Sequence, residues 1–151
     1  MKGKLMVYDI GGYVGMIMGA VSFLIGGFTP ATVFFLVFNL IDLFTGLANA
    51  TNNGEIESKI FTKGIFKKAG MWCVIIVAHG LDMVVFGGAD ITRLPVLMTL
   101  LANEGISIVE NAGKLGVTIP KSLVKYLAQL EDKSNDELKD KLDNDKDNNK
   151  E

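Results

Sequence analysis

The sequence of 151 residues has little of the material from which active sites and metal centres are built. Its single cysteine, Cys73, excludes an intramolecular disulfide and a cysteine-rich metal site. Its single histidine, His79, excludes a histidine cluster. No glycine-rich phosphate loop follows a predicted strand, and no nucleophile motif is present. The sequence therefore predicts a protein that is not an enzyme and that uses no metal or cofactor.

Charge is also scarce over most of the chain. The net charge is −2 at pH 7, which gives no general attraction to nucleic acid. No charged residue occurs between Asp9 and Asp42, whereas residues 131–151 hold nearly half of all the charged residues. Mean hydropathy is positive, at +0.33, although 21% of the residues are charged. Because a water-soluble domain does not need so long an uncharged run, the composition predicts a small membrane protein with a solvated tail.

Four apolar segments are each close to the ~20 residues that cross a bilayer as a helix. The pair Thr29-Pro30 separates the first two so tightly that they should form a helical hairpin. In the polar connection at 51–68, apolar residues are spaced for a short amphipathic helix at the membrane surface. In chain order the four segments are 10–28, 31–50, 69–88 and 91–109.

The segment at 91–109 has two interpretations. Its uncharged apolar core is short, Pro95 lies near its start, and Asn103 and Glu104 follow that core. It is either a fourth span that hides its polar residues against other helices or an amphipathic helix beside three spans. The predicted fold class is an all-α integral membrane protein of about four transmembrane helices, with three plus an amphipathic helix as the alternative.

The predicted organisation has four parts along the chain. A cytoplasmic head at 1–9 precedes a transmembrane helical domain at 10–113. Pro120 starts an amphipathic cytoplasmic helix within 114–130. The Asp-, Lys- and Asn-rich residues 131–151 cannot bury a core, so we expect a charged tail that is disordered or, as the alternative, a frayed, solvated helix. Lysines lie at alternate ends of the spans, which by the positive-inside rule places both termini in the cytoplasm.

Three of the four segments carry polar residues that should not face lipid, since an ionised carboxylate at the bilayer centre costs ~2.5–3.5 kcal/mol. On the second segment these residues share one helical face. They either line a water-filled pore in an oligomer or pair within one chain and hold its helices together. The candidate residues are Asn39, Asp42, Thr45 and Gly46 on the second segment, His79 and Asp82 on the third, and Asn103, Glu104, Ser107, Glu110 and Asn111 on the fourth.

Small residues recur on the first segment. Gly11, Gly15 and Gly19 follow one another at intervals of four, a spacing that lets two helix backbones approach closely. Three interpretations are open: a seam between copies of the protein, packing against the second segment of the same chain, or simply the glycine enrichment of membrane helices.

Several motifs resemble a known family. The most specific is NEGISIVENAGKLGVTIP at 103–120, and the next are NLIDLFTGLANA at 39–50 and KGIFKK at 63–68. Over roughly residues 36–127 the sequence resembles the phage lysis and clostridial toxin-secretion holins. These are small membrane proteins of bacteriophages of Gram-positive bacteria and of related toxin loci.

The resemblance implies a holin, which accumulates in the bacterial cytoplasmic membrane and then oligomerises into lesions that lead to host lysis. The partners it implies are further copies of the same chain, membrane lipid, and an endolysin or toxin as passing cargo. The residues taken alone also fit an antiholin, an accessory membrane subunit or a small ion channel.

Overall fold

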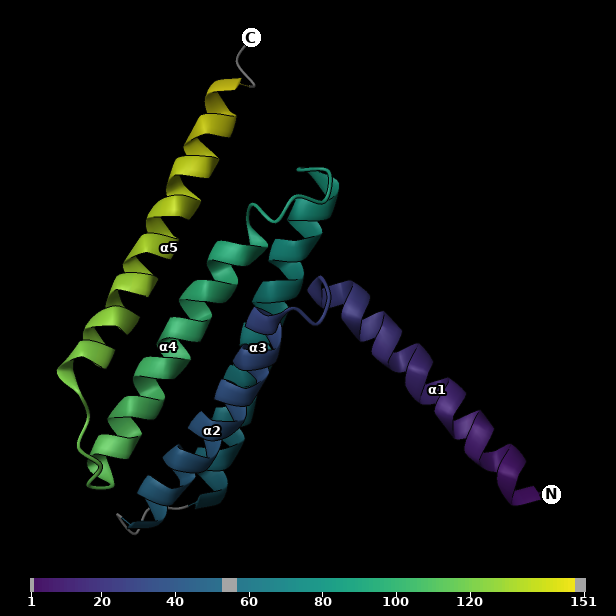
Figure 1. Ribbon diagram of the computed structural model, residues 1–151, viewed down its shortest axis with the longest axis horizontal. Helices are drawn as coiled ribbons and strands as arrows, with labels where there is room; N and C mark the ends of the chain where they lie inside the picture. Colours follow the sequence, from purple (N-terminus) through teal and green to yellow (C-terminus); the bar gives the residue numbers. More distant parts are fainter. Residues whose placement is uncertain (1, 53–56, 149–151) are drawn as a thin grey trace.

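The computed structural model describes residues 2–52 and 57–148, with side chains described for 10–52 and 58–136, and this part of the chain is all α-helical (Figure 1). The predicted all-α class is confirmed. In chain order the helices are α1 Lys2–Ile25, α2 Pro30–Asn52, α3 Glu57–Val84, α4 Arg93–Lys114 and α5 Lys121–Asn148.

Local sequence explains where the first hairpin turns. Gly26 and Gly27 end α1 with φ angles of 77° and 91°, a left-handed conformation that side chains with a Cβ rarely adopt. Pro30 then begins α2, where its missing N–H group leaves no helical hydrogen bond unmade. The hydroxyl of Thr29 accepts a hydrogen bond from the backbone N–H of Thr32 at 3.3 Å and so caps the new helix.

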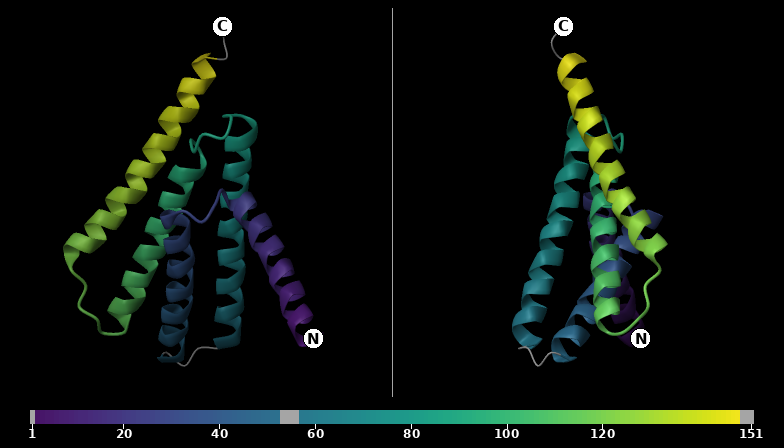
Figure 2. Two further views of the ribbon diagram at one scale, coloured as in Figure 1. Left: turned by 45° about the vertical axis from the view of Figure 1, so that its right-hand side comes forward. Right: turned by 90° about the vertical axis from the view of Figure 1, so that its left-hand side faces the viewer.

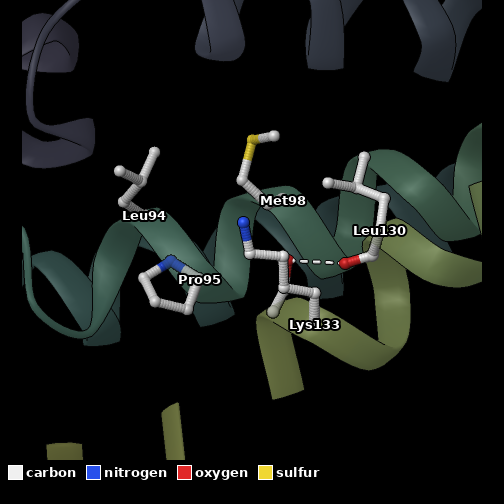
Figure 3. A pocket seen from close by; sticks show the side chains of 6 residues that line it. Leu94, Pro95, Met98, Leu130 and Lys133 are labelled. Atoms are coloured by element: carbon white, nitrogen blue, oxygen red, sulfur yellow. Dashed lines mark hydrogen bonds between the residues drawn. The ribbon is translucent and has the colours of Figure 1, made fainter. Parts of the chain in front are cut away.

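Consecutive helices run antiparallel, and α2, α3 and α4 lie side by side (Figures 1 and 2). α4 packs against α2, α3 and α5, whereas α1 packs against α3 near its C-terminal end and then diverges from the other helices. The C-terminal ends of α2 and α4 lie at one end of this arrangement, and those of α1 and α3 lie toward the other. α5 folds back along α4, where a hollow of about 220 Å³ remains between the two helices (Figure 3).

The buried apolar core is small and lies between α2, α3 and α4. Phe35, Ile75 and Leu97 are fully buried there, and the rings of Phe35 and Trp72 are 5.0 Å apart between centroids. Many more large apolar side chains are exposed along α1, α2 and α3, of which Met16, Phe44 and Phe66 are about 70% exposed. Such an apolar exterior is typical of a surface that meets lipid rather than water.

One helix in the described residues, α2, is long and apolar enough to cross a membrane by its length and composition. The apolar part of α1, Ile10–Ile25, is shorter. The predicted second segment agrees with α2 to within two residues at each end. Helix length and composition therefore do not decide between the three and the four spans predicted from the sequence.

Three boundaries differ from those predicted. α1 begins at Lys2, so the chain at 2–9 is part of a helix rather than a separate head. The predicted surface helix at 51–68 and the third segment form a single helix, α3, because no proline interrupts them. Of the two alternatives for the charged tail, the structure shows a helix rather than disorder as far as Asn148: α5 continues through it, since no proline or glycine follows Pro120 to end a helix.

Candidate functional site: a buried ion cluster between three helices

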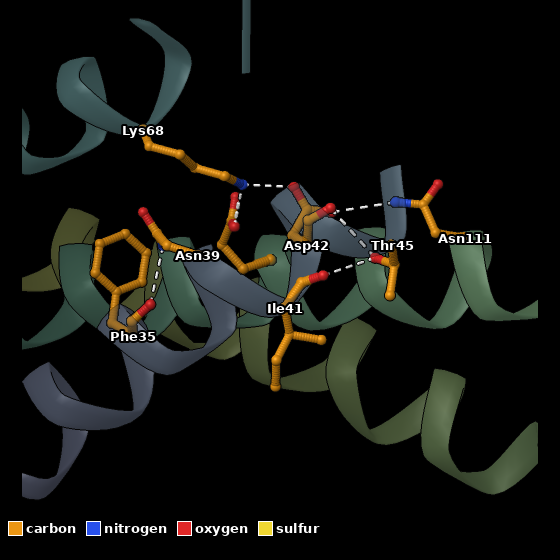
Figure 4. Close-up of polar contacts among 8 residues, drawn as sticks. Phe35, Asn39, Ile41, Asp42, Thr45, Lys68 and Asn111 are labelled. Carbon is orange, nitrogen blue, oxygen red and sulfur yellow. Dashed lines mark hydrogen bonds and ion pairs between the residues drawn. The ribbon is translucent and has the colours of Figure 1, made fainter. Parts of the chain in front are cut away.

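Three charged side chains from three different helices meet inside the bundle. The ammonium of Lys68 on α3 donates to the carboxylate of Asp42 on α2 at 2.5 Å and to that of Glu104 on α4 (Figure 4). The side chain of Glu104 is completely buried, and those of Lys68 and Asp42 are 10% and 12% exposed. We call Asp42, Lys68 and Glu104 the ion cluster. It joins α2, α3 and α4 at one point.

Helical spacing explains why Lys68 points inward. Lys68, Ile75 and Asp82 follow one another at intervals of seven residues on α3, which keeps them on one helical face. All three are buried. The same face therefore carries a charge near each end and an apolar residue of the core between them.

Neutral polar residues of α2 and α4 surround the ion cluster. The amide of Asn111 donates to Asp42 at 3.3 Å, so it holds the carboxylate oxygen that Lys68 does not contact (Figure 4). Asn39 and Thr45 instead donate to backbone carbonyls one turn earlier on α2, those of Phe35 and Ile41, each at 2.9 Å.

A shallow hollow of about 130 Å³ opens beside the ion cluster. Both polar and apolar residues of α2, α3 and α4 line it, including Asp42, Gly46, Ser107 and Asn111. Asp42 therefore has the ammonium of Lys68 on one side and an opening toward the exterior on the other.

The ion cluster holds two carboxylates for one ammonium, so it carries one excess negative charge when all three groups are ionised. Two nearby acceptor atoms, Oε1 of Glu104 and Oδ1 of Asn39, are buried without a hydrogen-bond partner in the described residues. Buried charges that are incompletely paired contribute little net stability, and removing one partner is strongly destabilising. The ion cluster is therefore a weak point of the bundle as well as its junction.

A second group of polar residues lies at the C-terminal end of α3. The fully buried carboxylate of Asp82 accepts hydrogen bonds from the backbone N–H groups of Thr92 and Arg93, both at 2.7 Å. These N–H groups lie at the start of α4, where no earlier helical carbonyl is available to accept them. Asp82 thus caps α4 from a neighbouring helix.

Arg93 extends this polar end toward α1. Its guanidinium forms a two-pronged ion pair with Asp90, at 2.8 and 2.6 Å, and donates to the carbonyl of Ile25 at 3.4 Å. The hydrogen bond from Arg93 holds the pKa of the Asp90 carboxyl below its ordinary value. Nδ1 of His79, close to Gly26, is buried without a hydrogen-bond partner in the part of the chain that the structure describes. This end therefore ties α1 to α3 and α4.

The predicted candidates fall into separate places. Asp42, Glu104 and Asn111 come together in or beside the ion cluster, whereas Asp82 and His79 lie at the other end of α3. Two of the remaining predicted residues of α4, Asn103 and Ser107, are half-buried, and Glu110 is exposed.

The glycines of α1 lie elsewhere again. Gly11, Gly15 and Gly19 are exposed, and a Cβ added at any of them would meet no atom within 4 Å. In the described residues these glycines do not pack against α2, and the seam between copies and simple glycine enrichment stay predictions.

Sequence reasoning treated Lys68 and Arg93 as residues at the ends of spans and missed both as site residues. Each has a buried position and at least one carboxylate partner. No group of histidine, cysteine, aspartate and glutamate in the described residues is arranged to hold a metal ion. This arrangement can keep charged side chains buried between the helices and can expose them to solvent when the helices separate.

Comparison with known proteins gives a family match over most of the chain. Residues 19–132 match the bacteriophage holin family. An uncharacterized protein of Clostridium perfringens (strain 13 / Type A) is 37% identical over 114 residues, which cover 76% of this chain and 84% of the relative. A protein of Bacillus phage phi105 named a probable holin is 35% identical over 108 residues, which cover 72% and 78%.

The similarity extends over nearly the whole chain in relatives from Listeria. An uncharacterized protein of Listeria innocua is 33% identical over 144 residues, which cover 95% of this chain and 96% of the relative. No solved structure matches.

Proposed function

Because this chain belongs to the bacteriophage holin family, we propose that it is a holin that oligomerises in the bacterial cytoplasmic membrane and forms lesions there. Proteins of this family are non-enzymatic membrane proteins. The lesions would let a folded endolysin or toxin cross and would end in host lysis. Further copies of this chain and membrane lipid are the partners of this step.

The observation that carries the proposal is the contrast between the ion cluster and the exterior. Charged side chains of α2, α3 and α4 are collected inside the bundle, while the outer faces of α1, α2 and α3 expose large apolar side chains. A bilayer stabilises that distribution, because lipid is a good environment for the exterior and a poor one for an ionised carboxylate.

In the arrangement that we propose for the lytic state, α1, α2, the apolar part of α3 and α4 cross the membrane, and both termini lie in the cytoplasm. Consecutive helices are antiparallel, which suits successive crossings. The start of α3 and the end of α4 lie at the same end of the bundle (Figure 2). The first half of α3 carries Lys59, Lys63 and Lys67, and Lys114 and Lys121 flank the connection between α4 and α5, as the positive-inside rule requires of a cytoplasmic end.

The ion cluster gives this proposal a mechanism. In the closed bundle each charged side chain of the cluster contacts an oppositely charged one, so none needs to face lipid. In an assembly of several copies the same faces of α2, α3 and α4 would turn toward water, where each charge is solvated. The excess negative charge of the ion cluster lowers the free-energy cost of moving the cluster from the bundle into water, since water solvates that charge better than the bundle interior does.

Induced expression in bacteria with a cytosolic reporter enzyme tests the proposal. A holin stops respiration and releases the folded reporter, and co-expressed endolysin then lyses the cells. Leakage of ions without reporter would indicate a small channel instead, and an unchanged culture would indicate an antiholin or accessory subunit. Either of these two results would contradict the proposal.

A further inference from the structure

α5 covers the side of α4 that α2 and α3 leave open. Leu94, Pro95 and Met98 of α4 face Leu130, Lys133 and Ser134 of α5 across the hollow of about 220 Å³ (Figure 3). The hydroxyl of Thr99 on α4 donates to the side-chain oxygen of Asn135 on α5 at 3.4 Å.

The two helices approach each other closely at a glycine. A Cβ added at Gly105 would lie 2.9 Å from a methyl carbon of Leu127, so the absence of a side chain at Gly105 lets α5 approach α4 there. Among the large apolar residues of α4, Leu94 is exposed, whereas α1, α2 and α3 each expose many such residues. In this state the large apolar residues of α4 other than Leu94 are buried or partly buried.

The outer face of α5 is incompatible with lipid. Asp132 and Asp136 are exposed, and the Thr99–Asn135 contact places them beside the first half of α4. In the proposed four-span arrangement that half of α4 lies within the hydrocarbon. Exposed ionised side chains are expelled from hydrocarbon, so α4 cannot cross the membrane while α5 remains bound along it.

We propose that α5 is a releasable cover of α4: it is bound in the state that the structure shows and detaches when α4 becomes the fourth span. Lipid and α5 would then compete for the same face of α4. This inference rests on the proposed function, because it supplies the step that converts a closed chain into one able to form lesions.

The first half of α5 has a place to go after it detaches. Leu123, Val124 and Tyr126 remain 44%, 43% and 69% exposed while α5 is bound, and Lys121 and Lys125 lie beside them. An amphipathic helix with exposed apolar residues and lysines binds the surface of an anionic membrane. The apolar residues of α5 that stay exposed while it lies along α4 would therefore be covered at the membrane interface.

A reversible cross-link across the contact tests the proposal with the full-length chain. Thr99→Cys and Asn135→Cys, introduced together into a Cys73→Ser background, place two thiols where the hydroxyl and amide oxygens now meet. The protein is reconstituted into vesicles of phosphatidylethanolamine and phosphatidylglycerol loaded with a folded enzyme. Each single cysteine variant, treated with the same oxidant, is the matched control.

We expect the oxidised double variant to release the enzyme about tenfold more slowly than the same protein after reduction, since α5 must open for release. The single variants should respond to neither oxidant nor reductant. Equal release by the oxidised and reduced forms, or failure of the two cysteines to cross-link at all, would overturn the inference. If the reduced protein and the Cys73→Ser parent release nothing, the proposed holin function itself fails.

A labelling measurement separates cover release from folding defects. Ser134 is 5% exposed against α4, whereas Asp136 is exposed. In the Cys73→Ser background, Ser134→Cys should react slowly with a water-soluble maleimide before lysis and about tenfold faster once release begins. Asp136→Cys should react quickly throughout. A constant reaction rate at position 134 would contradict detachment of α5.

Discussion

Lys68 on α3 and Asp42 on α2 lie 26 residues apart in the sequence, and their ammonium and carboxylate meet at 2.5 Å between the helices. Glu104 completes the ion cluster from α4 with a side chain that is completely buried. Each of the three helices therefore depends on the other two to keep its charge away from lipid. This dependence leads to predictions that separate the ion cluster from the charges around it.

Replacing Lys68 with methionine should destabilise the closed bundle by ~3–5 kcal/mol, because two carboxylates are then left buried without a cation. The measurement is the Tm of the purified protein in detergent. Lys67→Met is the matched control, since Lys67 is adjacent and exposed and its replacement should leave the Tm nearly unchanged. Equal Tm values for the two variants would show that Lys68 does not hold the bundle together.

Glu104→Leu should delay lysis while leaving membrane insertion intact. The change removes the excess negative charge, leaves Lys68 paired with Asp42 alone, and takes a polar group from the face that would meet water. The measurement is the time from induction to loss of culture turbidity in the presence of endolysin. Glu110→Leu on the exposed side of α4 is the control and should lyse nearly on time. Identical lysis times for both variants would exclude Glu104 from the mechanism.

Asp82→Ala should lower the stability of the chain by ~1–3 kcal/mol, because two buried N–H groups at the start of α4 lose their acceptor. Asp82→Asn keeps one acceptor oxygen and should lose less. Thermal unfolding in detergent compares the two variants. If alanine and asparagine were equally well tolerated, the cap would be irrelevant to stability.

The ion pair between Asp90 and Arg93 should make a small, acid-sensitive contribution to stability. The pKa of the Asp90 carboxyl in the folded protein is held below its value in the unfolded chain, which is ~3.9. The stabilisation is therefore present above the unfolded pKa and is lost as the pH falls through the folded pKa. The carboxylate is 45% exposed, so solvent screening should keep the effect below ~1 kcal/mol. Unfolding measured from pH 7 to pH 3 should show that Arg93→Gln removes this acid-sensitive component. An unchanged pH dependence would contradict the assignment.

The sequence predicts the helices of this protein better than it predicts their partners. The uncharged run and the proline at position 30 locate α2 closely, and the 3.6-residue period identifies its polar face. Which charge would meet Asp42 could not be read from α2 alone, because that contact depends on how three helices pack. The signal was present on α3, where counting back two heptads from Asp82 gives Lys68, but Lys68 was interpreted as a residue at the membrane surface.

Longer-range features were beyond prediction for a similar reason. The charged tail lacks the residues for a core of its own, so either disorder or a solvated helix was expected. The helix, with no proline or glycine to end it, continues to Asn148. Its apolar positions, including Leu127, find a surface on α4 that the spacing of apolar residues within α5 alone does not reveal. The uncertainty about three or four spans arose from α4, the helix that α5 covers.

The most direct test of the holin assignment uses the purified chain in vesicles loaded with both a small dye and a folded enzyme. A holin should release the two together once enough protein has accumulated in the membrane, and Lys68→Met should shorten the delay before release relative to Lys67→Met. Release of dye with complete retention of the enzyme at every protein density would contradict the account, because the lesions would then be too small to pass a folded protein.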